Sequence, residues 1–275
     1  MRPLDPLTRL LRGLDLEEIR PDVFRARTGA GAERLFGGLL LAQAVVAAGR
    51  TIAGRHLHSL HASFLRPGRS RVPLELAVER LRDGRSFSAR RITGTQAHDV
   101  TIVATASFTR PGEGISHQVP MPAAPHPEGL ADWEDLRAAM LGTERRQDVA
   151  VELRVCDPDP PNPGAGLAAY RRVWIRPRGE LPDDPLLHAA MFVFATDRTL
   201  LRVAARPHGP IWGVRQAASL DHAVWLHHAA RFDDWVLFVC ESPVAESGRA
   251  LALGAMYGRD GRRLLSVAQE GLLRF

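Results

Sequence analysis

The chain contains one short pattern twice, as Ser59-Leu60-His61-Ala62-Ser63-Phe64-Leu65 and as Ser219-Leu220-Asp221-His222-Ala223-Val224-Trp225-Leu226. Each copy follows a strongly apolar, helix-like stretch and precedes three strand-like runs separated by turn residues. Further segments repeat at an offset of roughly 160 residues, 86–91 against 246–251 and 104–108 against 268–272. A repeat of this length predicts two copies of one supersecondary unit, with a site where they differ. The second copy is polar where the first is apolar.

In the first copy, residues 36–48 are apolar on almost every side, which predicts a buried helix rather than a surface helix. A shorter helix over 6–19 and a strand over 22–26 are expected before it. Asp83-Gly84 is a hairpin-turn signal between two of the later strands. Those strands are expected near 57–65, 72–82, 85–96 and 100–109.

The second copy repeats this order. Asp184 followed by Pro185 is typical of a helix start, because aspartate caps the first turn and proline is favoured at the first helical position. The pattern predicts a strand over 171–176 and then a buried helix over 186–201. Asp260-Gly261 is again a turn signal. Strands are expected near 214–227, 235–242, 248–257 and 263–273.

Residues 110–166 interrupt the repeat with many prolines, which cannot continue a regular helix or strand. Only 131–141 looks helical, so we interpret this region as a surface linker. The predicted organisation is a first unit over 1–115, a linker over 116–168 and a second unit over 169–275. One buried helix wrapped by a long antiparallel sheet, occurring twice, predicts an α+β double-hotdog fold. Pairing the copies edge to edge covers the sheet edge that each exposes alone.

The composition excludes several classes of protein. With 45% hydrophobic residues and no apolar run of membrane-spanning length, we expect a globular protein that does not bind a membrane through a spanning helix. The first residues lack the apolar centre of a secretion signal. Cys156 and Cys240 have no metal-ligand spacing and fit a reducing compartment. A cytoplasmic location is therefore expected.

All 36 basic residues are arginine, and the formal net charge is +5. A genome that favours arginine codons explains this bias. The alternative is an anionic, phosphorylated ligand, because guanidinium groups pair bidentately with phosphate. The arginines are spread among acidic residues, with no basic tract and no amphipathic basic helix, so neither nucleic acid nor a membrane surface is expected as a partner.

The common catalytic signatures are absent, including the serine nucleophile elbow, the P-loop, the zinc-protease helix and the dinucleotide-binding glycine motif. His56, His58 and His61 are close in sequence. On a strand, however, His56 and His58 share one face and His61 takes the other. We interpret them as core or surface histidines rather than a metal site. No metal or organic cofactor is expected.

Asp197 lies late in an otherwise apolar helical stretch, where a carboxylate needs hydrogen-bond or charge partners. It is either a helix-end acid paired with Arg198 or Arg202, or a carboxylate that orients or deprotonates a water. Gln269 on the last strand and Ser219 are weak signals alone. Together, a carboxylate, an amide and a hydroxyl can hold one water for hydrolysis without a covalent nucleophile.

Several longer motifs occur in a recognisable order, and through them the chain resembles the type II acyl-CoA thioesterases, the TesB family of double-hotdog enzymes. The resemblance covers about Pro3 to Arg274. The matching segments are Phe36-Gly37-Gly38 with Gln43-Ala44, His58-Ser59 through Phe64-Leu65-Arg66-Pro67-Gly68, Leu81 to Arg91, Ala104 to Phe108, His117-Gln118, Met121-Pro122, Arg172 to Arg176, Pro182 to Asp184, Leu220-Asp221-His222 and Ala268 to Gly271.

The resemblance implies a catalytic aspartate, threonine and glutamine that activate water for direct attack on a thioester. The aspartate falls on Asp197 and the glutamine on Gln269. The threonine position holds Ser219, which keeps the hydroxyl but loses a methyl group and gains rotamer freedom. The aromatic residue that the family often has after Trp225 is Leu226 here. Both departures bear on chain-length preference.

The expected reaction is therefore hydrolysis of acyl-CoA to free CoA and a carboxylic acid. Backbone N–H groups at the start of the buried helix, at Gly37 and Gly38, are expected to stabilise the charge on the thioester carbonyl. The matching motifs also imply substrate binding by His58, Arg90 and Arg91. The acyl chain is expected between the units, with arginines near the mouth meeting the CoA phosphates. A homo-oligomer, dimer or tetramer, is expected.

Two other functions stay open. One is a hotdog hydratase or dehydratase for acyl thioesters, which needs a His/Asp pair; the other is a non-catalytic acyl-CoA-binding module. Asp221-His222, beside Ser219, is another candidate for a His/Asp pair. We interpret these two as packing residues, and an accessory role stays open. Only the second copy is expected to hold a competent water site. The helix over 39–48 has no carboxylate, and the counterpart of Gln269 is expected near Thr105.

Overall fold

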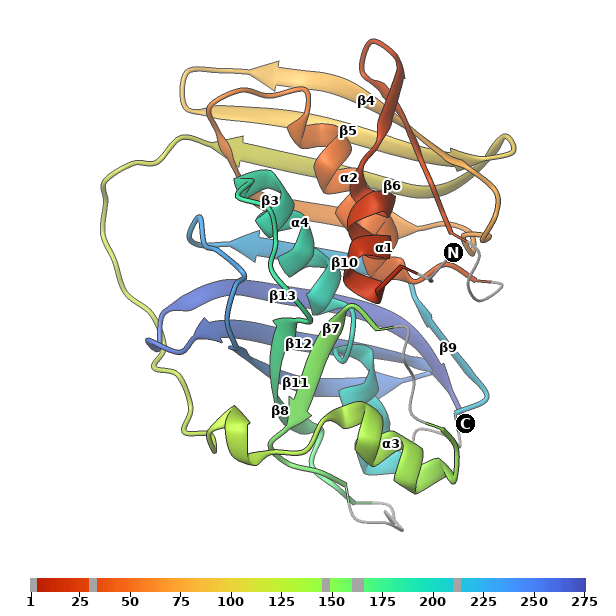
Figure 1. Ribbon diagram of the computed structural model, residues 1–275, viewed down its shortest axis with the longest axis vertical. Helices are drawn as coiled ribbons and strands as arrows, with labels where there is room; N and C mark the ends of the chain where they lie inside the picture. The colour runs from red at the N-terminus through yellow and green to blue at the C-terminus, as the bar shows by residue number, and fades with distance from the viewer. Residues whose placement is uncertain (1–3, 30–33, 145–148, 160–165, 210–213) are drawn as a thin grey trace.

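The computed structural model describes residues 4–29, 34–144, 149–159, 166–209 and 214–275. In this part of the chain, one 13-stranded antiparallel sheet packs against a central pair of helices (Figure 1). The first copy contains α1 (Pro6–Leu14), β1 (Glu17–Arg20), β2 (Val23–Ala26), α2 (Gly37–Gly49), β3 (His56–Phe64), β4 (Leu74–Asp83), β5 (Phe87–Gln96) and β6 (Asp99–Thr109). The rest contains η1 (Pro127–Gly129), α3 (Trp133–Leu141), β7 (Val151–Val155), β8 (Tyr170–Pro177), α4 (Pro185–Thr196), η2 (Leu201–His208), β9 (Gln216–Ser219), β10 (Asp221–Leu226), β11 (Val236–Glu246), β12 (Arg249–Gly258) and β13 (Arg263–Arg274).

The strand order is symmetric about its centre. It runs β1-β2-β4-β5-β6-β3-β10-β13-β12-β11-β8-β7, with β9 paired to β13 off this path. Counted outward from the central pair, the order is β3-β6-β5-β4-β2-β1 in one half and β10-β13-β12-β11-β8-β7 in the other. Equivalent strands of the two copies therefore occupy equivalent places. Figure 1 shows the first-copy strands at the top and the second-copy strands at the bottom, with α2 and α4 between them. The predicted double-hotdog fold is confirmed.

The two copies join through backbone pairing of β3 with β10. Leu60 faces Val224 and His61 faces Ala223 in this antiparallel ladder. Phe64 N–H extends the joint by donating to the carbonyl of Leu220 at 2.9 Å. Because each strand would otherwise be an exposed edge, this pairing satisfies its backbone groups and makes one continuous sheet.

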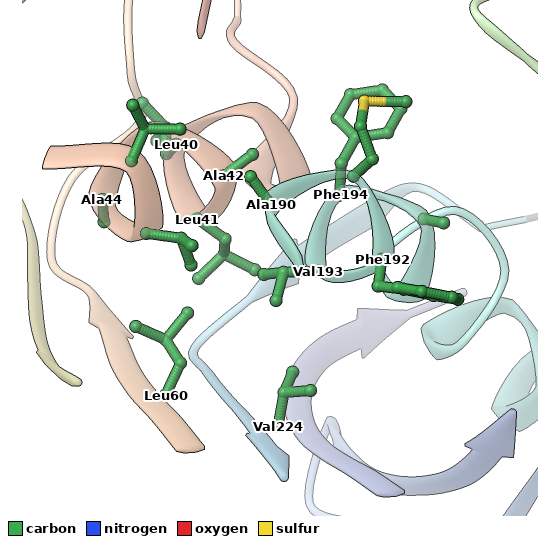
Figure 2. Packing of buried hydrophobic residues seen from close by; sticks show 14 of the residues in the cluster. Leu40, Leu41, Ala42, Ala44, Leu60, Ala190, Phe192, Val193, Phe194 and Val224 are labelled. Carbon is green, nitrogen blue, oxygen red and sulfur yellow. The ribbon is translucent and has the colours of Figure 1, made fainter. Parts of the chain in front are cut away.

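The two central helices are buried because their sequences are apolar all round. Asp184 caps α4 by accepting from the Leu186 N–H at 2.9 Å, with Pro185 at the first helical position, as the sequence predicts. In Figure 2, Leu41 and Ala42 of α2 face α4, while Leu60 and Val224 approach from the sheet. Small residues at this contact let the helices lie close together.

Four predicted elements differ from the structure, one of them the strand expected near 214–227, which is divided into β9 and β10. The helix expected over 6–19 ends at Leu14, and 17–20 forms the edge strand β1, because pairing with β2 outweighs the helix preference of its glutamates. The stretch 116–168, expected to be a linker, contains β7, which pairs with β8. Its pattern was hidden because Glu152 is buried but paired with Arg154 and Arg176. The helix expected over 186–201 ends at Thr196, and 3₁₀-helix η2 follows.

None of the helices in the described ranges is long and apolar enough to cross a membrane.

Candidate active site

Asp197 follows the last residue of α4 as its C-cap. Its Oδ1 accepts a hydrogen bond from Gln269 Nε2 at 2.9 Å, and its Oδ2 accepts one from the Gly38 N–H at 2.7 Å. Gln269 Nε2 also donates to Ser219 Oγ at 2.6 Å. The three residues singled out in the sequence therefore meet, although they come from α4, β9 and β13.

The sheet positions Gln269 and Ser219. Gln269 lies on β13 and is fully buried, since alternate residues of this strand face the helices. Ser219 is the last residue of β9 and pairs with Gly271 of β13. The strand is interrupted after it, where the Leu220 N–H donates to the Glu270 carbonyl at 2.9 Å. This interruption directs the Ser219 hydroxyl toward Gln269.

The start of α2 provides the remaining contact with the carboxylate. Gly38 N–H is among the first N–H groups of the helix, which have no partner within the helix and carry its partial positive charge. Glycine is required here, because a Cβ at Gly38 would lie 2.6 Å from the carbonyl oxygen of Phe194. A Cβ at Gly37 would lie 2.8 Å from Asp197 Oδ2. The helix backbone thus touches the carboxylate directly.

Burial raises the pKa of Asp197 to about 6, against the opposing effect of the hydrogen bonds from Gln269 and Gly38 and of the nearby Arg198 charge. The carboxylate is therefore mostly ionised at neutral pH and basic enough to accept a proton. This is the balance that suits a general base.

A cavity of about 570 Å³ opens onto Asp197 and Ser219. Gly37 lines it too, so the start of α2 faces the space. This volume is within the usual range for small-molecule sites. Its apolar residues include Leu40, Phe64 and Leu273, and four arginines also line it: Arg34, Arg66, Arg198 and Arg202. An apolar chain and an anionic group can both be accommodated.

Gln269 does not line this cavity but is buried next to Asp197 and Ser219, which do. Its Nε2 group contacts Asp197 and Ser219, whereas its Oε1 is buried and has no hydrogen-bond partner among the residues described. Reversing the amide would place an oxygen against the Asp197 carboxylate, so the charge on Asp197 fixes the amide orientation. The Gln269 amide thus bridges the other two side chains.

Three residues expected to bind substrate are not brought to the cavity. His58 Nε2 contacts Ser107 Oγ at 2.8 Å on β6, and burial lowers its pKa. Arg90 is buried and donates to Thr51 Oγ1 and Asp83 Oδ1, so it ties β5 to the end of α2. Arg91 is exposed on the opposite face of β5. Their motifs reflect packing and strand pairing here.

The rival pair beside Ser219 has a structural role. Asp221 Oδ1 accepts from the Glu270 N–H at 2.7 Å. Thr196 Oγ1 donates to the Val193 carbonyl, so it accepts from His222 Nε2 at 2.9 Å. Burial lowers the pKa of His222 to about 3, which keeps the ring neutral. Asp221 thus joins β10 to β13, and His222 joins β10 to the end of α4.

The four cavity arginines were not identified from the sequence. Arg66 lies in a matching motif, Leu65-Arg66-Pro67-Gly68, and this signal was available. Arg34, Arg198 and Arg202 follow no pattern, because they converge only through folding. The described ranges hold no cluster of three or more histidine, cysteine, aspartate or glutamate side chains suited to a metal ion.

The symmetry of the sheet identifies the counterparts of the site in the first copy. Gly49 is the last of the 13 residues of α2, and Asp197 directly follows the 12 residues of α4. Leu57 pairs with Phe108 just before a strand irregularity, as Ser219 pairs with Gly271.

The counterpart of Gln269 is Ala106. It precedes Phe108 by the same spacing that separates Gln269 from Gly271, and it is buried on the face toward the helices. The expected position near Thr105 was one residue off, because Thr105 faces solvent. Likewise Leu57, not Ser59, matches Ser219. The first copy therefore has no carboxylate, hydroxyl or amide at the three positions.

Comparisons with known proteins match both halves of the chain to acyl-CoA thioesterases. A family model described as acyl-CoA thioesterase matches residues 144–272, and one described as acyl-CoA thioesterase N-terminal domain matches residues 24–109. The chain is 35% identical to acyl-coenzyme A thioesterase 8 of Mus musculus, over 95% of this chain and 87% of that protein. It is 33% identical to acyl-CoA thioesterase 2 of Haemophilus influenzae, over 98% and 99%. The solved structure of a TesB protein of Mycobacterium avium subs paratuberculosis matches with a TM-score of 0.83 at 35% identity, over 98% of this chain and 100% of that one.

Proposed function

Because the chain belongs to the type II acyl-CoA thioesterase family, whose reaction is hydrolysis of acyl-CoA to CoA and a carboxylic acid, we propose that Asp197, Ser219 and Gln269 carry out this hydrolysis on a bound water. The observation that supports this most strongly is the Asp197 carboxylate itself. It accepts hydrogen bonds from Gly38 of the first copy and from Gln269 of the second. Asp197 and Ser219 line the same cavity.

In the proposed reaction, the ionised Asp197 accepts a proton from the water as the water oxygen attacks the thioester carbonyl. The tetrahedral intermediate then collapses. Its C–S bond breaks, the carboxylic acid is released, and the CoA thiolate takes up the proton held by Asp197. Ser219 hydrogen-bonds and orients the water, and does not form an acyl-enzyme.

The first helix is proposed to assist through its charge. Gly37 lies at the cavity and at the start of α2, so the partial positive charge of the helix end favours negative charge on the carbonyl oxygen. The Gly38 N–H is already used by Asp197, so its contribution is to fix the base. In this proposal Gly37 stabilises the carbonyl oxygen and Gly38 holds Asp197, whereas both were expected from the sequence to stabilise the carbonyl.

The two parts of the substrate are assigned by chemistry. The acyl chain is proposed to lie against Leu40, Phe64 and Leu273, and the phosphates of CoA to meet the arginines of the same cavity. No observation favours a hydratase, since His222 is buried, neutral and bonded to Thr196.

The test is to measure initial rates of CoA release with acyl-CoAs of short, medium and long chains, for the wild type and for Asp197→Asn. Thiol release that depends on Asp197 supports the proposal. A change in double bonds without thiol release, or binding without turnover, contradicts it.

We also propose that the enzyme works in the cytoplasm and as a homo-oligomer, dimer or tetramer. Two free cysteines, Cys156 and Cys240, are consistent with a reducing compartment. Partly exposed aromatic residues on the outer sheet face, Trp225 and Phe87, offer an area for self-association. Molar mass in solution, measured by light scattering, tests the oligomeric state.

A further inference from the structure

A second cavity, of about 250 Å³, opens at the other end of the α2–α4 pair. Gly37 and Asp197 line the first cavity, whereas Gly49 and Leu186 line the second. The helices run antiparallel, so the two cavities are separated by about 18 Å, the length of the helix between these positions. The second cavity is therefore the symmetric counterpart of the catalytic one.

The contacts of the helices show how the counterpart was altered. Gly38 of α2 approaches Asp197 at the first end, and the equivalent positions at the other end are Leu186 and Gly49. A Cβ at Gly49 would lie 2.2 Å from Leu186 Cδ1. The Leu186 side chain thus fills the space that the Asp197 carboxylate occupies at the other end, so the second cavity has no counterpart of Asp197.

The cavity nevertheless keeps an apolar lining. Leu57, Phe108 and Leu226 come from the sheet and its margin, and Ile52 and Ala189 come from the helix ends. Such a lining fits an aliphatic chain, as does the lining of the catalytic cavity.

One polar group of this cavity is unsatisfied. His188 lines the cavity and is buried, and its Nδ1 accepts from the Phe232 N–H at 3.0 Å. The proton of the neutral ring is therefore on Nε2. This N–H has no hydrogen-bond partner among the described residues, and the nearby Asp233 Oδ1 lies 4.0 Å away. A ligand oxygen that accepts from it would satisfy a buried donor.

The charges at this cavity limit the head group of a ligand. Arg55 donates to Ser88 Oγ and the Gly84 carbonyl, both at 2.5 Å, and Arg231 pairs with Asp183 and Asp233. These pairings leave little excess positive charge for the several phosphates of CoA. A ligand with one small oxygen-bearing head group is favoured instead.

We propose that the second cavity binds a free aliphatic carboxylic acid without chemical change, with its chain on Leu57, Phe108 and Leu226 and one oxygen accepting from His188 Nε2–H. Arg55, at the same cavity, is bonded to uncharged groups, the Ser88 hydroxyl and the Gly84 carbonyl, so its charge offsets the negative charge of the acid. Free acids are the product class of the thioesterase reaction, so the choice of ligand rests on that activity. The site does not rest on the roles assigned to Asp197, Ser219 and Gln269.

The experiment is a calorimetric titration of the full chain with octanoate, in an Asp197→Asn background and in the wild type. Ala218→Trp obstructs the catalytic cavity, and Ala230→Trp obstructs the second one. Octanoate is expected to bind the Ala218→Trp protein with one site per chain and to lose this site in the Ala218→Trp/Ala230→Trp double variant. His188→Phe, also in the Ala218→Trp protein, is expected to weaken it about tenfold.

Ala229→Trp serves as a second obstruction, because Ala229 is exposed and its replacement leaves the core intact. CoA release by Ala230→Trp, measured without octanoate, is expected to match the wild type. Octanoate binding that Ala218→Trp abolishes, or that persists in the Ala218→Trp protein unchanged by Ala230→Trp, Ala229→Trp and His188→Phe, would overturn the proposal. That result would leave the catalytic assignment untouched.

Discussion

The Asp197 carboxylate receives hydrogen bonds from both copies of the repeat, from Gly38 on one side and Gln269 on the other. These bonds support an ionised group in a partly buried position. They also orient it relative to Ser219, which shares the Gln269 amide. A substitution at Asp197 is therefore expected to affect stability and activity differently. It removes the free-energy cost of a buried charge, and it also removes the proposed base.

We expect Asp197→Asn to lower kcat by roughly 10²-fold or more, because a positioned base contributes about this much. The melting temperature is expected to hold or rise. Steady-state kinetics and thermal unfolding of the same preparation measure both. Gln118→Glu, a change on the surface linker, is a matched control for altering one amide or carboxyl group. Near wild-type turnover in Asp197→Asn would show that Asp197 is not the base.

The pKa of Asp197 also predicts how stability depends on pH. The pKa is about 6 in the folded state and 3.8 in the reference state, so between these values the folded protein binds a proton that the unfolded chain lacks. Stability from this group therefore falls as pH rises through that window, by about 3 kcal/mol in total. Asp197→Asn is expected to be more stable than the wild type at pH 8 and to lose that advantage near pH 4. Urea unfolding at both pH values measures the difference, and a constant difference would contradict the raised pKa.

Ser219 tests whether the hydroxyl orients water or attacks the substrate. Ser219→Thr keeps the hydroxyl and is expected to be active, whereas Ser219→Ala is expected to be impaired but measurably active. Gln269 Nε2 would still hold Asp197 in either variant. Mass spectrometry of the enzyme quenched during turnover provides the check. An acyl group attached to Ser219 would rule out direct attack by water.

Among the elements, α2 contacts Asp197 through the backbone of its first turn. Gly37→Ala would place a Cβ 2.8 Å from Asp197 Oδ2 and 3.2 Å from the Phe64 ring, so the carboxylate must move. We expect kcat to fall about tenfold, since small displacements of a catalytic group are costly, with little change in melting temperature. Gly13→Ala is the control, because its nearest contact would be 3.7 Å. Unchanged kcat in Gly37→Ala would mean that the carboxylate position is not critical.

Sequence patterns predicted the elements that are apolar all round or alternate cleanly, such as α2, α4 and the strands after each. They failed where charge is buried in pairs. The charged residues Glu152 and Arg154 hid the strand Val151–Val155, yet Glu152 is paired with both Arg154 and Arg176. The helix α3, which the sequence predicted over 131–141, also buries a charged residue, since Glu134 contacts Arg137 and Arg198. Such pairs depend on folding, so no local pattern reveals them.

The site residues show the same division. Asp197, Gln269 and Ser219 meet as the sequence predicted, because motif order identified them and the fold class brought the copies together. The wall of the cavity was not predictable in this way. Its arginines come from the segments before α2 and after β3, from the residue after the α4 C-cap and from η2, so they meet only in the folded chain.

In the described part of the molecule, a cavity lies at each end of the α2–α4 pair, and the proposed catalytic groups lie at one end. A tight-binding, non-hydrolysable acyl-CoA analogue is therefore expected to titrate one active centre per chain. Gly49, Leu57 and Ala106 provide no group for water activation in the first copy. Loss of initial rate against analogue concentration measures the stoichiometry. Complete inactivation only at two equivalents per chain would show that both ends are catalytic.

The symmetric strand order has a consequence for inheritance. In a dimer of identical chains, every mutation is present at both ends of the helix pair, so a replacement that spoils one end spoils the other. Here both copies lie in one chain and pair through β3 and β10. Gly49 and Asp197, which occupy equivalent positions in the two copies, can therefore mutate independently. Selection can therefore preserve Asp197 at one end of the helix pair while the other end changes independently.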